Sequence, residues 1–206
     1  MARIRAAVAR EFGAPLVIED VELRAPEAGE VEVTLDACAI CHSDISFMDG
    51  GWGGELPAIY GHEAAGTITA MGAGVKGYAM GDKVLVTLIR SCGDCAPCSS
   101  GAPVACDGDN SMDGPITLPD GTAVTQGMAC GAFAEKVVVQ PRQLAKLPDD
   151  IAMDVASLLA CGVITGVGAV VNSAALRPGQ TAVIIGAGGV GLNAIQGARI
   201  AGAAKI

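Results

Sequence analysis

Four cysteines within fifteen residues constrain this chain more than any other feature. Cys92, Cys95 and Cys98 follow one another at intervals of three, and Cys106 comes eight residues later. Four thiolates at this spacing can wrap one tetrahedral zinc ion and leave no coordination position open for chemistry. An iron–sulfur cluster also takes four cysteines, but bacterial ferredoxin spacing brings the fourth cysteine closer and follows it with proline. We therefore predict a structural zinc, whose binding folds a surface lobe with little core of its own.

Length, charge and cysteine usage exclude several classes of protein. The 206 residues, 51% of them apolar, suffice for one large domain or two small ones. The net charge is −9 and the 13 basic residues form no cluster, which argues against a nucleic-acid partner. Arginines interrupt the N-terminal segment, and the apolar stretch 155–171 is short for a bilayer span, so we predict neither signal peptide nor membrane helix. Eight cysteines then favour metal binding in a reducing, cytoplasmic compartment over disulfides.

The N-terminal part of the chain has the alternation of a β-structure. β-Branched and polar residues alternate over residues 4–22, 29–38 and 63–70, and a glycine-rich turn leads to a further strand at residues 81–86. Residues 107–131 contain three Asp-Gly pairs and predict a long surface excursion with a hairpin. Together these runs predict a small all-β barrel of antiparallel strands.

A second candidate metal site centres on the pair His62-Glu63. A neutral imidazole is a good zinc donor, and a catalytic zinc typically takes three protein ligands and leaves one position open. Cys41 and Cys161 are the candidate partners of His62. By itself the pair is equally compatible with a histidine packed beside a helix or strand.

The other cysteines allow alternatives. Residues 41–44 predict the start of a short helix that Ser43 or Asp44 can cap. Cys38 and Cys41 form a Cys-x-x-Cys pair, which also occurs in thioredoxin-like redox sites, but that motif belongs near a βαβ pattern that is missing here. For Cys130, burial in the core is favoured over a ligand role.

The C-terminal part contains a glycine-rich loop in a specific context. A helix is predicted at residues 154–160, and an apolar run at 180–185 predicts a buried parallel strand. The strand leads into Gly186-Ala-Gly188-Gly-Val-Gly191 and a helix at residues 192–201. This order matches the dinucleotide fingerprint, in which the free amides of a helix N-terminus hold a pyrophosphate. A simple tight turn is the alternative.

Five segments together resemble a known family in order and spacing: Cys41-His42-Ser43-Asp44, Gly61-His62-Glu63, the four-cysteine segment, Cys161-Gly162-x-x-Thr165-Gly166 and the glycine loop 186–191. They closely resemble the zinc-dependent medium-chain alcohol dehydrogenase family. The resemblance implies an α/β fold with a β-rich part. A GroES-like β-barrel catalytic domain would occupy residues 1–162, and the truncated start of a Rossmann domain residues 163–206. It also implies hydride transfer between an alcohol and NAD or NADP, giving an aldehyde or ketone.

The resemblance also implies two zinc ions per chain. The catalytic zinc would bind Cys41, His62 and Cys161, with Glu63 beside it as an outer or exchangeable ligand. The structural zinc would bind Cys92, Cys95, Cys98 and Cys106.

Further roles are implied for the residues after Cys41 and for the glycine loop. Ser43 is similar to the hydroxyl that takes the alcohol proton, His42 to the contact with the cofactor pyrophosphate, and Asp44 to the carboxylate that orients the zinc-bound imidazole. Glu63 belongs to the same catalytic group. The cofactor-binding positions implied by the resemblance are His42, Thr165, Gly186, Gly188, Gly189, Val190 and Gly191, with Thr165 and Val190 on the nicotinamide side.

Two departures from the family pattern are visible. Ser46 stands where several members have a histidine that ends the proton relay, so the proton is expected to leave by water or another hydroxyl. The acidic residue that holds the ribose is expected about 20 residues past the glycine loop, and the sequence ends at Ile206. We therefore leave NAD and NADP open and expect a fragment of a longer, homo-oligomeric enzyme.

Two alternatives to a simple alcohol dehydrogenase stay open. The same zinc site could act on a polyol, an aryl alcohol or a thiol adduct of formaldehyde, a choice that the loop at residues 50–57 is expected to make. In the other alternative, the chain is a catalytically silent zinc-binding fold.

Overall fold

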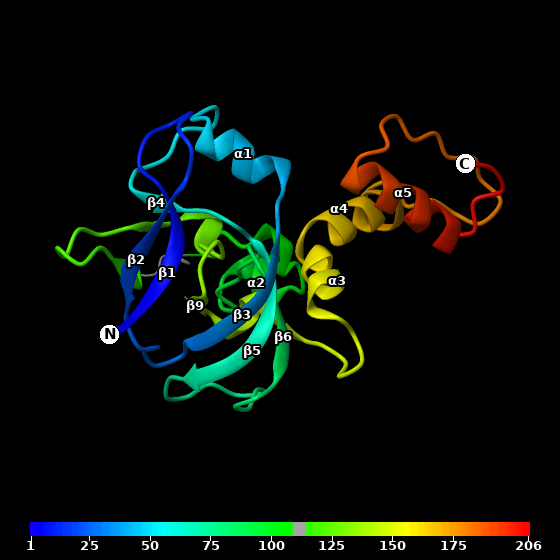
Figure 1. Cartoon of the computed structure of the whole chain (residues 1–206). Coiled ribbons are helices and arrows are strands. Elements are labelled where there is room, and N and C mark those ends of the chain that lie inside the picture. The colour runs from blue at the N-terminus through cyan, green and yellow to red at the C-terminus, as the bar shows by residue number, and fades with distance from the viewer. Residues whose placement is uncertain (109–113) are drawn as a thin grey trace. The chain divides into compact units, whose positions relative to one another are not determined.

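The computed structural model describes residues 1–108 and 114–206 and divides into two compact units, Met1–Ser157 and Leu158–Ile206 (Figure 1). The assignment of residues 1–162 to a catalytic domain and 163–206 to a cofactor-binding domain stays a prediction.

The first unit is built from two five-stranded sheets. One has the order β7-β2-β1-β4-β8 and the other β10-β6-β5-β3-β9. All neighbouring pairs are antiparallel except β4 with β8. The strands are β1 (Ala2–Ala9), β2 (Val17–Leu23), β3 (Val31–Ala39), β4 (Ala58–Ile59), β5 (Glu63–Met71), β6 (Lys83–Thr87), β7 (Ile116–Thr117), β8 (Thr125–Gln126), β9 (Lys136–Val139) and β10 (Leu144–Lys146).

The segment before β9 joins the two sheets. The N–H of Ala7, in β1, donates to the carbonyl oxygen of Phe133 at 2.8 Å, and the N–H of Glu135 donates to that of Arg5 at 3.1 Å. On its other side, the N–H of Leu35, in β3, donates to the carbonyl oxygen of Glu135 at 2.9 Å. Because one strand-like segment pairs with both sheets, the predicted β-rich barrel is confirmed.

Alternating side chains of these strands fill the barrel. Val31 and Val33 from β3 and Val84 and Val86 from β6 are fully buried in one cluster with Ile68 of β5. Full burial of each such side chain stabilises the fold by about 1.5–3 kcal/mol. The period-two pattern seen in the sequence is therefore the inside face of the sheets.

The segment at residues 107–131 was predicted to be a surface excursion with a hairpin, and the structure agrees only in part. The expected hairpin forms at Asp120-Gly121, where the N–H of Leu118 donates to the carbonyl oxygen of Thr122 at 2.8 Å. However, Ile116 and Leu118 are buried, and β7 pairs with β2. The segment thus contributes a strand and buried core residues. It does so because it pairs with β2, which lies nearly a hundred positions earlier in the chain. The Asp-Gly pair that begins at residue 113 lies partly outside the described residues.

The helices of the first unit are short. They are α1 (His42–Met48), α2 (Ala96–Ser99) and α3 (Met153–Ser157), with 3-10 turns at Pro103–Ala105, Gly127–Ala129 and Pro141–Gln143. The N-cap residue of α1 is Cys41, and Asp44 caps the helix as predicted, from the first turn, where its carboxylate accepts the N–H of Cys41 at 2.9 Å.

The second unit is helical. It contains a 3-10 turn at Leu158–Ala160, α4 (Gly162–Gly168), a π-helical turn at Ala169–Ser173 and α5 (Gly189–Ile200). A Cβ on Gly166 would lie 2.4 Å from the carbonyl oxygen of Val190, and one on Gly197 would lie 3.0 Å from the Cα of Val167. These glycines therefore allow α4 and α5 to approach closely.

The predicted parallel strand at residues 180–185 does not form. An isolated parallel bridge links Thr181 to Lys205, and Val183 and Ile185 are 84% and 96% exposed. A parallel strand needs continuous backbone hydrogen bonding to a neighbouring strand. In the described part of the second unit, this run makes a single bridge instead.

No helix in residues 1–108 or 114–206 is by itself long and apolar enough to cross a membrane. The stretches Met153–Ala160 and Gly162–Ser173 reach that length and apolar content only when taken together, and the chain bends between them.

Candidate functional site

The four predicted zinc-binding cysteines converge. The sulfur atoms of Cys92, Cys95, Cys98 and Cys106 all lie within 4.8 Å of one another. The Sγ atoms of Cys95 and Cys106 are 3.8 Å apart and those of Cys92 and Cys98 are 4.0 Å apart. Four sulfurs bound tetrahedrally at about 2.3 Å from one ion would be separated by about 3.8 Å. The cluster therefore fits a single tetrahedral zinc.

Backbone N–H groups prepare these sulfurs for a metal. The N–H groups of Asp94 and Cys95 donate to Cys92 Sγ at 3.4 and 3.3 Å, and the N–H of Cys92 donates to Cys106 Sγ at 3.3 Å. The hydrogen bonds from Asp94 and Cys95 lower the pKa of Cys92 below its usual value. The turn that aims these groups passes through Gly93, whose φ of +87° favours glycine.

A second cluster lies in the first unit where α1 and β5 begin. The ligand atoms of Cys41, His62 and Glu63 lie within 4.8 Å of one another. His62 and Glu63 are 1% and 4% exposed, so the imidazole and the carboxylate are held out of bulk water. A thiolate, an imidazole and a carboxylate together form a donor set that suits zinc.

Asp44 joins the two segments that carry these ligands. Its Oδ1 lies 3.1 Å from His62 Nδ1 and accepts the N–H of Gly61 at 2.9 Å, while its Oδ2 accepts the N–H of Cys41 at 2.9 Å. The Asp44 side chain is fully buried. One carboxylate therefore fixes the backbone beside Cys41 and His62 as well as the imidazole itself.

The position of His62 also depends on a close backbone approach. Gly61 has φ +90°, and a Cβ there would lie 2.7 Å from the backbone nitrogen of Phe133. The N–H of Phe133 donates to the carbonyl oxygen of Tyr60 at 2.8 Å. A residue with a side chain at position 61 would move the strand that presents His62.

The other site residues predicted from the sequence lie in α1 and in the second unit. In α1, His42 is exposed and Ser43 is half-buried. In the second unit, Cys161 is the N-cap residue of α4, and its Sγ lies 3.9 Å from Thr165 Oγ1. The predicted roles of these four residues, including Cys161 as the third ligand, stay predictions.

The glycine loop ends in the N-terminus of a helix. Gly186 has φ +100°, Gly188 is the N-cap residue of α5, and a Cβ on Gly191 would lie 2.0 Å from the carbonyl oxygen of Gly186. A Cβ on Gly188 or Gly189 would meet no atom within 4 Å. The loop lines an open cavity of about 480 Å³. Free amides beside open space suit a phosphate group.

Two further cysteines are poorly ionised thiols: Cys38 is half-buried and Cys130 is buried. Burial raises the pKa of Cys38 and of Cys130 to about 12. Cys38 therefore carries almost no thiolate near neutral pH, which argues against a thioredoxin-like role for the pair with Cys41. Cys130 is fully buried in the barrel core, as expected.

Two glutamine side chains near His62 could not be identified from the sequence. Gln126 and Gln143 bind the turn at residues 127–131, which is followed by residues hydrogen-bonded to Tyr60 and Gly61. Neither glutamine belongs to a recognisable motif, so only their hydrogen bonds in the folded chain identify them.

Comparison with known proteins agrees with this geometry. Residues 27–149 match the family model for the alcohol dehydrogenase GroES-like domain. The chain is 39% identical to an S-(hydroxymethyl)glutathione dehydrogenase of Paracoccus denitrificans, over 99% of this chain and 57% of the relative. It is also 39% identical to an alcohol dehydrogenase of Malus domestica, over 99% of this chain and 56% of the relative.

Two solved structures are similar over the same extent. An alcohol dehydrogenase zinc-binding domain protein from Burkholderia ambifaria superposes with a TM-score of 0.92 at 36% identity, covering 98% of this chain and 57% of that one. Benzyl alcohol dehydrogenase from Acinetobacter calcoaceticus gives a TM-score of 0.91 at 30% identity, covering 99% and 57%. The chain thus spans a little over half the length of these proteins. It belongs to the family with the alcohol dehydrogenase GroES-like domain, which confirms the predicted membership of the zinc-dependent medium-chain alcohol dehydrogenases.

Proposed function

We propose that this chain supplies the catalytic metal centre and the first part of the cofactor site of a zinc-dependent oxidoreductase, which transfers a hydride between an alcohol and NAD or NADP. The observation that carries the proposal is the buried cluster of Cys41, His62 and Glu63, joined by the Asp44 carboxylate. Family membership supports the same reaction class.

Cys41, His62 and Cys161 would hold the catalytic zinc, and Glu63 would lie beside it or exchange with a ligand. A zinc ion held there would supply Lewis-acid chemistry, which makes an alcohol easier to deprotonate near neutral pH. The Asp44 carboxylate lies at His62 Nδ1, which favours the tautomer with a proton on Nδ1 and leaves Nε2 for the metal.

The hydroxyl of Ser43 would take the proton of the alcohol. Ser43 is half-buried in the first turn of α1, and Ser46, also half-buried, lies three residues further along the same helix. Residues three apart lie on neighbouring positions of a helix surface. The proton can therefore pass toward solvent along hydroxyl groups and water, without the histidine that several family members have.

The cofactor would lie over the glycine loop. The free N–H groups at Gly188 and Gly189 would hold its pyrophosphate, and the exposed imidazole of His42 would add a contact. Thr165 and Val190 would line the nicotinamide side.

The four-cysteine lobe would hold a second, structural zinc. Its four thiolates leave no open coordination position, so this ion would stabilise the lobe and take no part in turnover. The eight cysteines form no disulfide bond in the described structure, which supports our proposal of a reducing, cytoplasmic location. On the ground of family membership we also propose homo-oligomers for the enzyme.

The names of two similar proteins indicate candidate substrate classes. One is named an S-(hydroxymethyl)glutathione dehydrogenase and a structural neighbour a benzyl alcohol dehydrogenase. A panel of ethanol, benzyl alcohol and S-hydroxymethylglutathione with NAD and NADP would rank the substrate classes.

Zinc content per chain tests the proposal most directly. We expect two zinc ions in the wild-type protein, one in Cys41→Ser and one in Cys98→Ser, with alcohol-dependent NAD(P) reduction abolished in Cys41→Ser. The two variants would lose different ions, because each removes a thiolate from a different cluster. One zinc in both wild type and Cys41→Ser would contradict the catalytic site and favour a silent zinc-binding fold.

A further inference from the structure

A turn beside the candidate metal centre has an unusual backbone. Met128 and Ala129 have φ values of +50° and +57°, although both carry a side chain. Non-glycine residues rarely adopt this region, and two in succession persist only where the surroundings hold them. The turn 127–131 must therefore be held by specific contacts.

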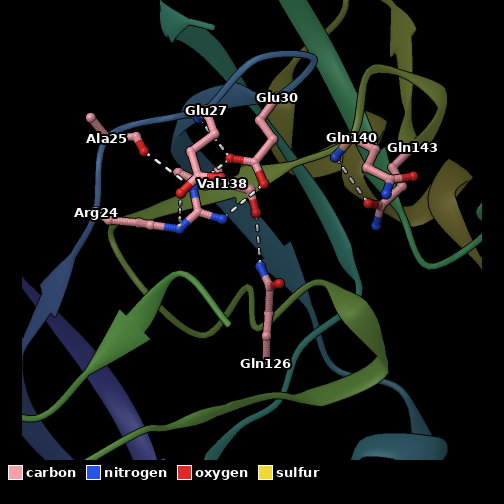
Figure 2. Close-up of polar contacts among 8 residues, drawn as sticks. All are labelled: Arg24, Ala25, Glu27, Glu30, Gln126, Val138, Gln140 and Gln143. Carbon is pink, nitrogen blue, oxygen red and sulfur yellow. Dashed lines mark hydrogen bonds and ion pairs between the residues drawn. The ribbon is translucent and has the colours of Figure 1, made fainter. Parts of the chain in front are cut away.

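Two glutamine side chains provide these contacts. Gln126 Nε2 donates to the carbonyl oxygen of Cys130 at 2.9 Å. It also donates to that of Val138 at 3.0 Å (Figure 2). Gln143 is fully buried, and its Nε2 donates to the carbonyl oxygen of Ala129 at 2.9 Å.

Gln143 also contacts the strand that pairs with Glu63. Its Nε2 donates to the carbonyl oxygen of Thr87 at 3.1 Å, and Thr87 is the residue directly opposite Glu63 in the pairing of β5 with β6. Its Oε1 accepts the N–H of Gln140 at 3.1 Å (Figure 2). The carboxamide thus has two donors and one acceptor satisfied, and its orientation is fixed.

The strained turn and the residue after it also contact this segment. Ala132, just after the turn, donates its N–H to the carbonyl oxygen of Gly61 at 2.9 Å. A Cβ on Gly127 would lie 2.4 Å from the Tyr60 ring, so the turn packs directly on the residues before His62. Gln143 therefore touches both the strand opposite Glu63 and the turn that contacts Gly61.

We propose that Gln143 is a positioning residue for the candidate metal centre: its carboxamide ties β6 and the turn 127–131 to each other next to Gly61–Glu63 and so fixes His62 and Glu63 in register with Cys41. This inference rests on the proposed function, because it assumes that these residues bind zinc. It concerns no residue that touches the metal or the substrate.

The test compares the two zinc centres of one chain. We would measure zinc affinity by chelator competition in the wild type, Gln143→Met and Gln143→Glu, which preserve the length of the side chain but remove the carboxamide. We expect the affinity of the centre containing His62 to fall about tenfold or more, as for other residues that orient ligands. The four-cysteine centre should keep its wild-type affinity.

A matched control separates positioning from general stability. Val139→Ala removes buried volume from the same barrel core but keeps the Gln143 carboxamide and its hydrogen-bond partners, and it should not weaken the centre containing His62 selectively. If either Gln143 variant fails to fold, Gln126→Met is used, which loosens the same turn and should give a smaller but still selective loss.

A spectroscopic readout is independent of metal affinity. The chain has two histidines, His42 and His62, so the ¹⁵N-histidine NMR spectrum contains signals from only these two rings. We expect the Nδ1–H signal of His62 to shift in Gln143→Met and to remain unchanged in Val139→Ala.

Three results would overturn the inference: unchanged affinity of the His62 centre, equal loss at both centres, or the same selective loss in Val139→Ala. If the wild-type protein binds zinc at the four-cysteine centre alone, that result contradicts the proposed function itself. That result is distinct, because it appears before any variant is made.

Discussion

The Asp44 carboxylate lies 3.1 Å from Nδ1 of His62, and both side chains are almost completely buried. The same carboxylate accepts N–H groups from Gly61 and Cys41, so one residue of α1 holds both ligand-bearing segments. A buried carboxylate with three such partners is costly to replace, because each partner then loses its acceptor.

Asp44→Asn should weaken zinc binding at the centre containing His62 by about 10- to 100-fold. The amide keeps one oxygen but turns an NH₂ group toward an N–H donor, which should also cost about 1–3 kcal/mol of stability. Chelator competition and urea unfolding measure the two effects. Asp49→Asn, at the exposed C-terminal end of the same helix, is the control and should change neither.

Zinc removal should open the four-cysteine lobe and leave the barrel folded. No side chain among residues 92–106 is buried, and Val104 is 83% exposed, so the lobe has no apolar core to stabilise it. Metal binding must then provide its folding free energy. Limited proteolysis of Cys98→Ser, or of chelated wild type, should cut within this segment. Cys130→Ala, which removes a thiol outside both centres, should resist cleavage there; equal cleavage in all samples would refute the argument.

Gly191→Ala and Gly188→Ala should have different effects in the glycine loop. A Cβ on Gly191 would lie 2.0 Å from the carbonyl oxygen of Gly186, which should destabilise the second unit by about 1–3 kcal/mol. A Cβ on Gly188 meets nothing within 4 Å, so that variant should fold normally yet bind NAD(P) more weakly, because the added methyl lies where a pyrophosphate would approach. Thermal unfolding and calorimetric titration distinguish these results. Wild-type cofactor affinity in Gly188→Ala would count against the dinucleotide site.

Glu30 should make stability depend on acid pH. Burial raises the pKa of Glu30, but hydrogen bonds from Arg24 and from the N–H of Glu27, together with the Arg24 charge, outweigh burial and leave the pKa below its usual value (Figure 2). A lowered carboxyl pKa stabilises the fold above the unfolded-state pKa of about 4.3, and this contribution disappears as pH falls through the folded-state value.

Glu30→Gln should therefore destabilise the protein at neutral pH, and its difference from wild type should shrink below about pH 4. Urea unfolding at several pH values measures this difference. Glu11→Gln, on the exposed turn between β1 and β2, is the control. A difference that is constant with pH would show that the Glu30 carboxylate contributes through packing alone.

The local parts of the site were predictable because neighbouring residues form them. Cys92, Cys95, Cys98 and Cys106 need only a few tight turns to meet around one point. The barrel strands were likewise readable, since alternation along one strand reports which face is buried. The helix start at residue 41 was placed correctly. Ser43 and Asp44 both have cap-forming side chains, and only the backbone path decides that Asp44 accepts the N–H of Cys41.

Parts that depend on distant partners were not predictable. The run at residues 180–185 has the composition of a buried strand, yet it forms one bridge in the described structure because β-pairing requires a neighbour, not only a suitable sequence. The segment containing Ile116 and Leu118 reads as a surface loop but supplies core residues, because β2 lies beside it.

The sequence by itself determined the candidate metal donors, the glycine loop and the period of the barrel strands, because each is encoded within a short stretch of chain. Only the tertiary structure decided how those donors are held. Asp44 could be suspected from its neighbours, but Gln143 acquires its position only when β6, the turn 127–131 and Gly61–Glu63 are folded together. Hydrogen bonds between segments far apart in sequence depend on the register of the whole barrel, which no single stretch of residues specifies.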